Sequence, residues 1–340
     1  MVEGNRWLIY ALGGGWGHLN RAIALARQAP HPVEILVNSP YATAVETVLE
    51  DPHITLRMLP ADLSAATAPT YVQAWISQPA NCLIVDTFPR GLVGELADIL
   101  PKLQLPRILI HRDLNPNYIA AKNITAFVRQ HYDQILIPGE PSAPLAHLPQ
   151  AHGTDPWLLR EADELSRVRD QVRDCWQLPS DRPVIIICAT GRPDEAQRFG
   201  ELLGAIAATF PHCAVRCLAH HRPPNCHPAQ WISHWPGMDV LQLADLVVGG
   251  AGYNLTYECK ALQIPLIALP LDRQYDRQDR RAAQHTFPVR QTSDCLSTIT
   301  QRLTQWRPRP AIPRYTNGNH AALRAIMTVT RANHRPAPRG

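Results

Sequence analysis

Residues 6–26 read RWLIYALGGGWGHLNRAIALA, an apolar run followed by a dense group of glycines and then an alanine-rich, amphipathic stretch. A short apolar run of this kind is typical of a buried parallel strand, and the spacing of the apolar residues after the glycines predicts a helix. Glycines between a strand and a helix permit positive φ and let a ligand approach the backbone. In open parallel sheets such turns lie at the carboxyl ends of the strands, where ligands bind. The stretch therefore predicts an α/β fold and a candidate site at its glycine turn.

The same alternation of apolar runs and helical patterns continues along the chain. The later runs are VEILVN (33–38), ITLRMLP (54–60), NCLIVDTF (81–88), PRILIHRD (106–113), DQILIPGE (133–140), RPVIIICATG (182–191), CAVRCLA (213–219), ADLVVGGAG (244–252) and IPLIALPL (264–271). The proline-rich residues 139–156 interrupt this pattern and indicate a linker. Because 340 residues exceed the usual core of one domain, we expect two βαβ domains in series.

The pattern divides the chain into four expected segments. They are an N-terminal Rossmann-like domain over residues 1–145, a linker and hinge over 146–180, a second Rossmann-like domain over 181–312, and a C-terminal helix over 313–340 that packs back across the junction and ends in a basic tail.

Composition excludes several classes of protein. A formal net charge of +4 is too small to indicate a nucleic-acid partner. The sequence has neither the pattern of a secretory signal nor an apolar run of the ~18 residues that a membrane span needs. The eight cysteines are scattered, as in a protein whose thiols stay reduced. We expect a cytoplasmic protein and leave open a peripheral contact with a membrane surface.

The first glycine turn does not match the known phosphate-binding motifs. The dinucleotide motif G-x-G-x-x-G needs glycine where His18 stands, and the second expected strand ends in Asn38 rather than in an acid. A Walker loop would need Gly-Lys-Ser/Thr. His18 begins the expected helix, and an imidazole can accept a proton at neutral pH. We therefore predict that His18 is a catalytic base, with capping of the loop as the alternative.

Other polar residues follow the neighbouring apolar runs. Asp86 ends one run and is a candidate for orienting a base, and His111 and Asp113 are candidates for lining the same crevice. The segment HRDLNPN (111–117) is not a kinase catalytic loop, because Tyr118 occupies the place of the required Asn. Residues 212–227 contain several cysteines and histidines but no C-x-x-C pair, so we expect a strand there and no metal site.

A second glycine turn, GGAGYN (249–254), also lies between an expected strand and helix. Its backbone N–H groups and the start of the helix can hold a diphosphate. Glu258, about one turn into that helix, can accept hydrogen bonds from the vicinal hydroxyls of a sugar. The run LPLDRQYDRQDRRA (269–282) suits a polyhydroxylated ligand, and ATGRPDE (189–195) places Arg192 where it can contact phosphate.

Together these motifs resemble the GT-B glycosyltransferases. They are most similar to glycosyltransferase family 28, the group that contains the lipid-linked N-acetylglucosaminyltransferase of peptidoglycan synthesis. GGGWGHLNRAIALA matches the N-terminal turn of that group, and residues 244–282 follow the order of its C-terminal motif. The chain departs from the group at Arg281, where an Asn is usual, and at Arg277, where an acid or Gln is usual.

The resemblance implies two Rossmann-like domains that face each other across a cleft, and a role for each motif. Glu258 would bind the ribose of a nucleotide-sugar donor, the second turn its diphosphate, and Gln278 with Asp276 its sugar. The implied donor-binding residues are Thr190, Gly191, Arg192, Gly249, Gly250, Gly252, Tyr253, Asn254, Glu258, Asp276 and Gln278. The acceptor-side candidates are Gly14, Gly15, Gly17, Arg21, Asp86, His111 and Asp113, with His18 as the base.

The expected reaction is inverting and independent of metal. Helix N-termini and Arg192 can stabilise a leaving diphosphate, with UDP as the expected nucleotide. Retaining enzymes of this architecture often carry two glutamates eight positions apart. The residues eight positions before and after Glu258 are Gly250 and Leu266, so the second glutamate is missing and we expect inversion. We expect no cofactor beyond the nucleotide-sugar co-substrate, and the acceptor stays open among small molecules, glycans and lipid-linked groups. A nucleotide-sugar hydrolase or epimerase, or a non-catalytic nucleotide-sugar-binding protein, is the alternative.

Overall fold

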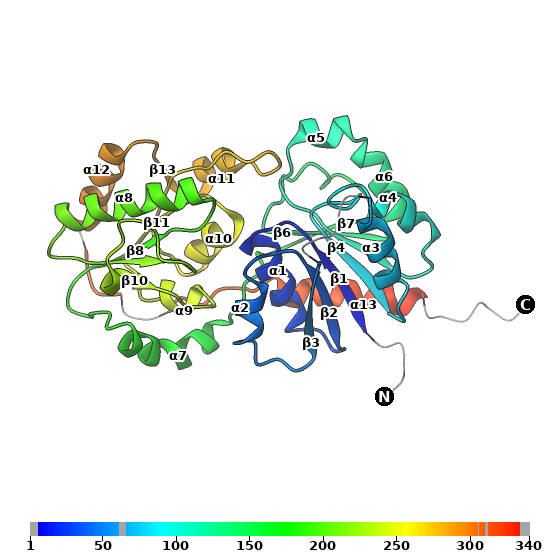
Figure 1. Ribbon diagram of the computed structural model, residues 1–340, viewed down its shortest axis with the longest axis horizontal. Coiled ribbons are helices and arrows are strands. Elements are labelled where there is room, and N and C mark those ends of the chain that lie inside the picture. Colours follow the sequence, from blue (N-terminus) through cyan, green and yellow to red (C-terminus); the bar gives the residue numbers. More distant parts are fainter. Residues whose placement is uncertain (1–5, 61–65, 305, 310–311, 334–340) are drawn as a thin grey trace, which may run out of the picture. The chain divides into compact units, whose positions relative to one another are not determined.

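A computed structural model describes residues 6–60, 66–304, 306–309 and 312–333. The chain forms two compact units, one of residues 1–158 together with 317–340 and one of residues 159–316. Each unit is built on its own parallel sheet flanked by helices (Figure 1).

The first unit contains a seven-stranded sheet in the order β3-β2-β1-β4-β5-β6-β7. Every neighbouring pair in it is parallel. The strands are β1 (Trp7–Ala11), β2 (Val33–Val37), β3 (Ile54–Met58), β4 (Cys82–Asp86), β5 (Arg107–Ile110), β6 (Gln134–Pro138) and β7 (Ala151–Thr154). β1, β2 and β4 are buried throughout, because helices cover both faces of such a sheet. The order of the strands reverses between β1 and β4, which is the point where doubly wound sheets bind ligands.

Helices connect these strands as crossovers. They are α1 (Trp16–Ala26), α2 (Ala42–Glu46), α3 (Ala68–Ile76), α4 (Leu96–Ile99), the 3-10 turn η1 (Leu100–Lys102), α5 (Pro116–Ala121) and α6 (Ile124–His131). The last helix, α13 (Asn319–Asn333), also belongs to this unit and lies against α1, β6 and β7. The predicted basic tail lies, from residue 334 on, outside the described residues.

Residues 146–180, predicted as a linker and hinge, contain ordered elements of both units. β7 pairs with β6 along its whole length and forms the edge of the first sheet. Its sequence, AHGT, has no apolar face, because an edge strand is held by backbone pairing on one side and is otherwise exposed. The helix α7 (Ala162–Cys175) begins the second unit.

The second unit repeats the same topology. Its six-stranded parallel sheet has the order β10-β9-β8-β11-β12-β13, which again reverses at its centre. The strands are β8 (Val184–Cys188), β9 (Ala214–Leu218), β10 (Trp231–Ile232), β11 (Leu246–Gly249), β12 (Leu266–Ala268) and β13 (Phe287–Pro288). The remaining helices are α8 (Pro193–Thr209), η2 (Pro228–Gln230), α9 (Met238–Leu241), α10 (Tyr253–Ala261), α11 (Gln278–His285) and α12 (Thr292–Leu303).

The predicted fold class, α/β with two Rossmann-like domains, is therefore confirmed. No helix of the described residues is long and apolar enough to cross a membrane.

Candidate active site

The first glycine turn joins β1 to α1 where the strand order of the first sheet reverses. Gly14 has a φ of +67°, a conformation that favours glycine. Asn38, just after β2, accepts hydrogen bonds through Oδ1 from the backbone nitrogens of Gly13, at 2.7 Å, and Gly14, at 2.9 Å. Asn38 stands where dinucleotide-binding domains carry the acid that binds ribose. In this protein its side chain instead holds the backbone of the glycine turn.

The imidazole of His18 occupies the space that a side chain at residue 13 would need. A Cβ atom on Gly13 would lie 2.1 Å from Cδ2 of His18. At Gly15 and Gly17 a Cβ atom would meet no described atom within 4 Å. The glycine at position 13 is therefore needed to seat the histidine, and the other two leave the surface of the turn open.

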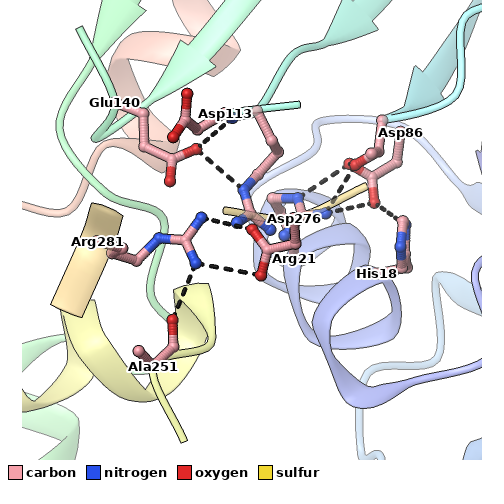
Figure 2. Close-up of polar contacts among 10 residues, drawn as sticks. His18, Arg21, Asp86, Asp113, Glu140, Ala251, Asp276 and Arg281 are labelled. Carbon is pink, nitrogen blue, oxygen red and sulfur yellow. Dashed lines mark hydrogen bonds and ion pairs between the residues drawn. The ribbon is translucent and has the colours of Figure 1, made fainter. Parts of the chain in front are cut away.

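His18, Arg21 and Asp86 converge at the end of β4 (Figure 2). The spacing of three along α1 places His18 and Arg21 on one face of the helix. Nδ1 of His18 lies 2.7 Å from Oδ2 of Asp86. Arg21 donates from Nε to Oδ1 of Asp86, at 2.9 Å, and from Nη2 to Oδ2, at 2.7 Å. One carboxylate thus holds both a histidine and an arginine.

The electrostatics of this cluster keep Asp86 ionised. Burial of Asp86 raises its pKa, but the positive charge of Arg21, the neighbouring His18 and the hydrogen bonds to the carboxylate lower it by more, so the pKa lies well below its usual range. The ring of His18 stacks on Phe88, with the centroids 5.6 Å apart and the planes at 17°. Because Nδ1 faces Asp86, Nε2 is the ring nitrogen that can accept a proton from a bound hydroxyl.

The residues after β5 form a second polar cluster. His111 is fully buried, and its Nε2 accepts a hydrogen bond from the backbone of Leu145, at 3.2 Å. Burial lowers the pKa of His111 to about 3, so the ring stays neutral and secures the loop after β6. The backbone nitrogen of Asp113 and Nε of Arg112 both donate to Oε2 of Glu140, at 2.8 Å and 3.2 Å. Arg112 and Glu140 were not predicted, although each follows an apolar run as Asp86 does.

The second glycine turn lies between β11 and α10. Gly249 and Gly250 are tightly packed, because a Cβ atom on either would come within 3.0 Å of a neighbouring leucine side chain. Gly252 precedes α10 and has open space at its Cβ position. Within the described residues, the buried Nδ2 of Asn254 and Oγ1 of Thr256 have no hydrogen-bond partner. The turn thus combines a helix N-terminus with polar atoms whose hydrogen-bonding capacity is unused.

The polar run after β12 holds this turn in place. Oε1 of Gln278 accepts hydrogen bonds from the backbone nitrogens of Ala251 and Leu271, each at 3.1 Å. Arg281 donates from Nη1 to the carbonyl of Ala251, at 2.9 Å, and from Nη2 to Oδ1 of Asp276, at 2.6 Å (Figure 2). The arginine that departs from the family 28 motif therefore links the turn to Asp276.

Glu258 is buried one turn into α10, and among the described residues no positive charge offsets the cost of its burial. Burial and, to a smaller extent, the negative charge of Asp239 together raise its pKa to about 7. Asp239, which was not predicted, is held by Nε and Nη2 of Arg160, at 2.9 Å and 2.8 Å. Tyr253 is also buried, and its ring lies 4.7 Å from that of Tyr257.

The third turn of the second unit is exposed. Thr190, Gly191 and Arg192 follow β8 and lie at the surface, and Gly191 has a φ of +139°. The backbone nitrogen of Arg192 donates to Oε2 of Glu195, at 2.7 Å, and Arg273 donates from Nη2 to the same oxygen, at 2.7 Å. The start of α8 is thereby fixed while the side chain of Arg192 stays exposed.

The cysteine- and histidine-rich residues 212–227 contain β9, an inner strand, as predicted. In the described part of the chain, no three His, Cys, Asp or Glu side chains are grouped so that they could hold a metal ion.

No protein-family model and no curated protein matches this sequence. Solved structures match nearly all of it. The glycotransferase of kitacinnamycin is 13% identical, with a TM-score of 0.60, over 97% of this chain and 94% of its own. A spinosyn rhamnosyltransferase complexed with thymidine diphosphate is 15% identical, with a TM-score of 0.59, over 96% of each chain. A UGT transferase from Siraitia grosvenorii in complex with UDP is 13% identical, with a TM-score of 0.53, over 99% of this chain and 96% of its own. At this identity the likeness shows the fold, which is that of the GT-B glycosyltransferases.

Proposed function

We propose that this chain is an inverting, metal-independent glycosyltransferase that moves a sugar from a nucleoside diphosphate, with UDP as the expected nucleotide, to a hydroxyl group of an acceptor. The first unit supplies the base and the second unit binds the donor. The observation that carries the proposal is the contact between Nδ1 of His18 and Oδ2 of Asp86, 2.7 Å long, at the carboxyl end of β4.

That contact gives His18 the arrangement of a general base. A buried carboxylate 2.7 Å from Nδ1 favours the tautomer whose lone pair is on Nε2, and it stabilises the imidazolium that forms. Nε2 takes the proton of the acceptor hydroxyl while the acceptor oxygen forms a bond to the anomeric carbon. The bond between that carbon and the diphosphate oxygen breaks, and its electron pair leaves with the nucleoside diphosphate. A single displacement of this kind inverts the anomeric centre.

The donor assignment depends on the second glycine turn. The dipole at the N-terminus of α10 favours an anion, and the unused polar atoms of Asn254 and Thr256 lie in the first turn of the same helix. In its ionised form, Glu258 can accept hydrogen bonds from both ribose hydroxyls. Arg192 can contribute positive charge to the leaving diphosphate, which makes a metal unnecessary. The neighbours that were solved with UDP and thymidine diphosphate support a nucleoside diphosphate as the ligand.

Turnover of nucleotide sugars by the wild type and by His18→Ala tests the proposal. We expect nucleotide release with a panel of hydroxyl-bearing acceptors to fall by ~100-fold or more in His18→Ala, because general-base catalysis contributes about that factor. The exposed histidine of β7 supplies a control, and His152→Ala leaves the rate unchanged. Proton NMR of the product should show an inverted anomeric centre.

Other outcomes would favour the alternatives. Release of nucleotide that needs no acceptor and depends on His18 would indicate a hydrolase. Binding of a nucleotide sugar without any turnover would indicate a non-catalytic protein. Turnover that is the same in His18→Ala as in the wild type would exclude His18 as the base.

A further inference from the structure

Arg21 is a buried cation that a histidine–carboxylate pair does not by itself require. Its side chain is fully buried on α1, and its guanidinium group contacts both oxygens of Asp86. We infer that Arg21 is a positioning residue, which turns the carboxylate of Asp86 so that Oδ2 faces His18 and keeps that carboxylate ionised. The inference rests on the proposed function only where it concerns turnover.

The first step is geometric. The planar guanidinium donates two parallel hydrogen bonds, of 2.9 Å and 2.7 Å, and a two-point contact of this kind fixes the plane of a carboxylate. In that orientation Oδ2 of Asp86 lies 2.7 Å from Nδ1 of His18. Without this two-point contact, the carboxylate of Asp86 could rotate about χ2, whose energy well is broad.

Thr87 adds a third contact to the arrangement. Its Oγ1 accepts from Nη2 of Arg21 and donates to Oδ1 of Asp86, each at 3.2 Å. Thr87 has a φ of +72°, which is rare for a β-branched residue and costs free energy. The contacts of its hydroxyl group with Arg21 and Asp86 help to hold this conformation.

The second step concerns charge. Arg21 and His18, both on α1, are the cationic and titratable groups that act on Asp86, and Thr87 contacts it from the residue directly after β4. After the neighbouring strand β5, Arg112 contacts Glu140 instead. Burial favours the protonated form of Asp86, and the charge of Arg21 is the strongest of the influences that oppose it. A protonated Asp86 could not stabilise the imidazolium of His18, so Arg21 maintains the charge on which the base depends.

Two variants of Arg21 and one control test the inference. Arg21→Lys keeps the positive charge but cannot make the two parallel hydrogen bonds. Arg21→Met removes the charge and the hydrogen bonds. Arg27 lies at the end of the same helix, 3.1 Å from Asp51, so Arg27→Met is the matched control. The measurements are the 13Cγ NMR signal of Asp86 against pH, which needs no substrate, and the pH profile of nucleotide release with kcat and KM.

We expect the Asp86 signal of the wild type, of Arg21→Lys and of Arg27→Met to stay at its ionised position wherever the protein is folded. In Arg21→Met the midpoint of the Asp86 titration should rise by about 1–3 pH units. As the pH is lowered, kcat of this variant should begin to fall at a pH that is higher by the same amount. We expect kcat at neutral pH to fall by about 10-fold in Arg21→Lys and about 100-fold in Arg21→Met, with KM for the donor nearly unchanged.

An unmoved Asp86 signal in Arg21→Met would overturn the inference, whatever happens to kcat. If Arg21→Met does not fold, Arg21→Lys decides: a lower kcat with unchanged KM supports positioning, and an unchanged kcat contradicts it. If the wild type turns over no nucleotide sugar, the proposed function fails, and the NMR titration still tests Arg21.

Discussion

Two carboxylates of this protein, Asp86 and Glu258, are buried to a similar degree, and their pKa values move in opposite directions. Asp86 faces the cation Arg21 and the imidazole of His18, whose combined effect outweighs the cost of burial. Glu258 faces another carboxylate, Asp239, which adds to that cost. The neighbours of each side chain therefore decide whether burial produces a permanent anion or a group that titrates near neutral pH.

Glu258 should lower the stability of the ligand-free fold at neutral and alkaline pH. Its pKa is 4.5 in an unperturbed chain and about 7 in the fold. Between these values the unfolded chain loses the proton first, so the free energy of unfolding decreases as pH rises through that window. Glu258→Gln removes the effect and should be more stable than the wild type by about 3 kcal/mol at pH 8.

Urea unfolding of both proteins at pH 5 and pH 8 measures this difference. The advantage of Glu258→Gln should be small at pH 5 and full at pH 8. A difference that does not change between the two pH values would contradict a raised pKa for Glu258.

At the scale of elements, the two glycine turns use their glycines for packing as much as for access. Gly249 and Gly250 make room for leucine side chains, and Gly13 makes room for His18. Glycines at which the Cβ space is open are the ones that leave room for a ligand, and in these two turns they are Gly14, Gly15, Gly17 and Gly252.

Gly13→Ala should displace His18 without unfolding the protein. The added Cβ would lie 2.1 Å from the imidazole, and a single side chain can rotate away more easily than the backbone can shift. We expect turnover to fall as far as in His18→Ala, with a small change in melting temperature. Gly17→Ala, where the space is open, is the control for stability and should be neutral or slightly stabilising, since glycine is unfavourable inside a helix. Full activity of Gly13→Ala would show that His18 does not need its observed position.

The strands and the turns between them could be predicted, because buried parallel strands leave continuous apolar runs and their last residues carry the polar side chains. The strand β7 could not be predicted, since its sequence AHGT lies at a sheet edge and has no apolar pattern. The contact of Arg21 with Asp86 was also beyond prediction, because it joins residues that the chain separates by 65 positions. Both residues were candidates, but only the pairing of β4 beside β1 in the sheet brings them together. Asp239 gives no signal at all, since it lies in a four-residue helix away from any strand end.

At the scale of the whole molecule, the two units differ in how the chain builds them. The first is assembled from residues 1–158 and 317–340, with Asn317 bonded to the backbone nitrogen and oxygen of Leu158, at 3.1 Å and 2.9 Å. The second is one continuous segment, and the hydroxyl of Tyr315 donates to the carbonyl of Arg160, at 2.8 Å, so its two ends meet. A continuous segment with its own core and adjacent ends has the properties of an independent domain.

Residues 159–316, expressed alone, should therefore fold and bind a nucleoside diphosphate. The fragment contains the second glycine turn, Glu258 and the residues that hold them, and it lacks His18. We expect a cooperative thermal transition and binding of UDP within about threefold of the full chain, since separate domains contribute nearly additively. Residues 1–158 alone lack α13 and should be less stable. A fragment 159–316 that folds but does not bind would place the nucleotide site elsewhere.

Calorimetric titration with UDP, thymidine diphosphate, GDP and ADP tests whether the protein uses a nucleotide sugar that binds at the second glycine turn. The titrations are made on the wild type, on Glu258→Ala and on Glu201→Ala, whose glutamate is exposed on α8. We expect selective binding of one nucleoside diphosphate, namely UDP, that is lost in Glu258→Ala and kept in Glu201→Ala. Absence of binding to all four, or binding that is the same in Glu258→Ala as in the wild type, would contradict this expectation.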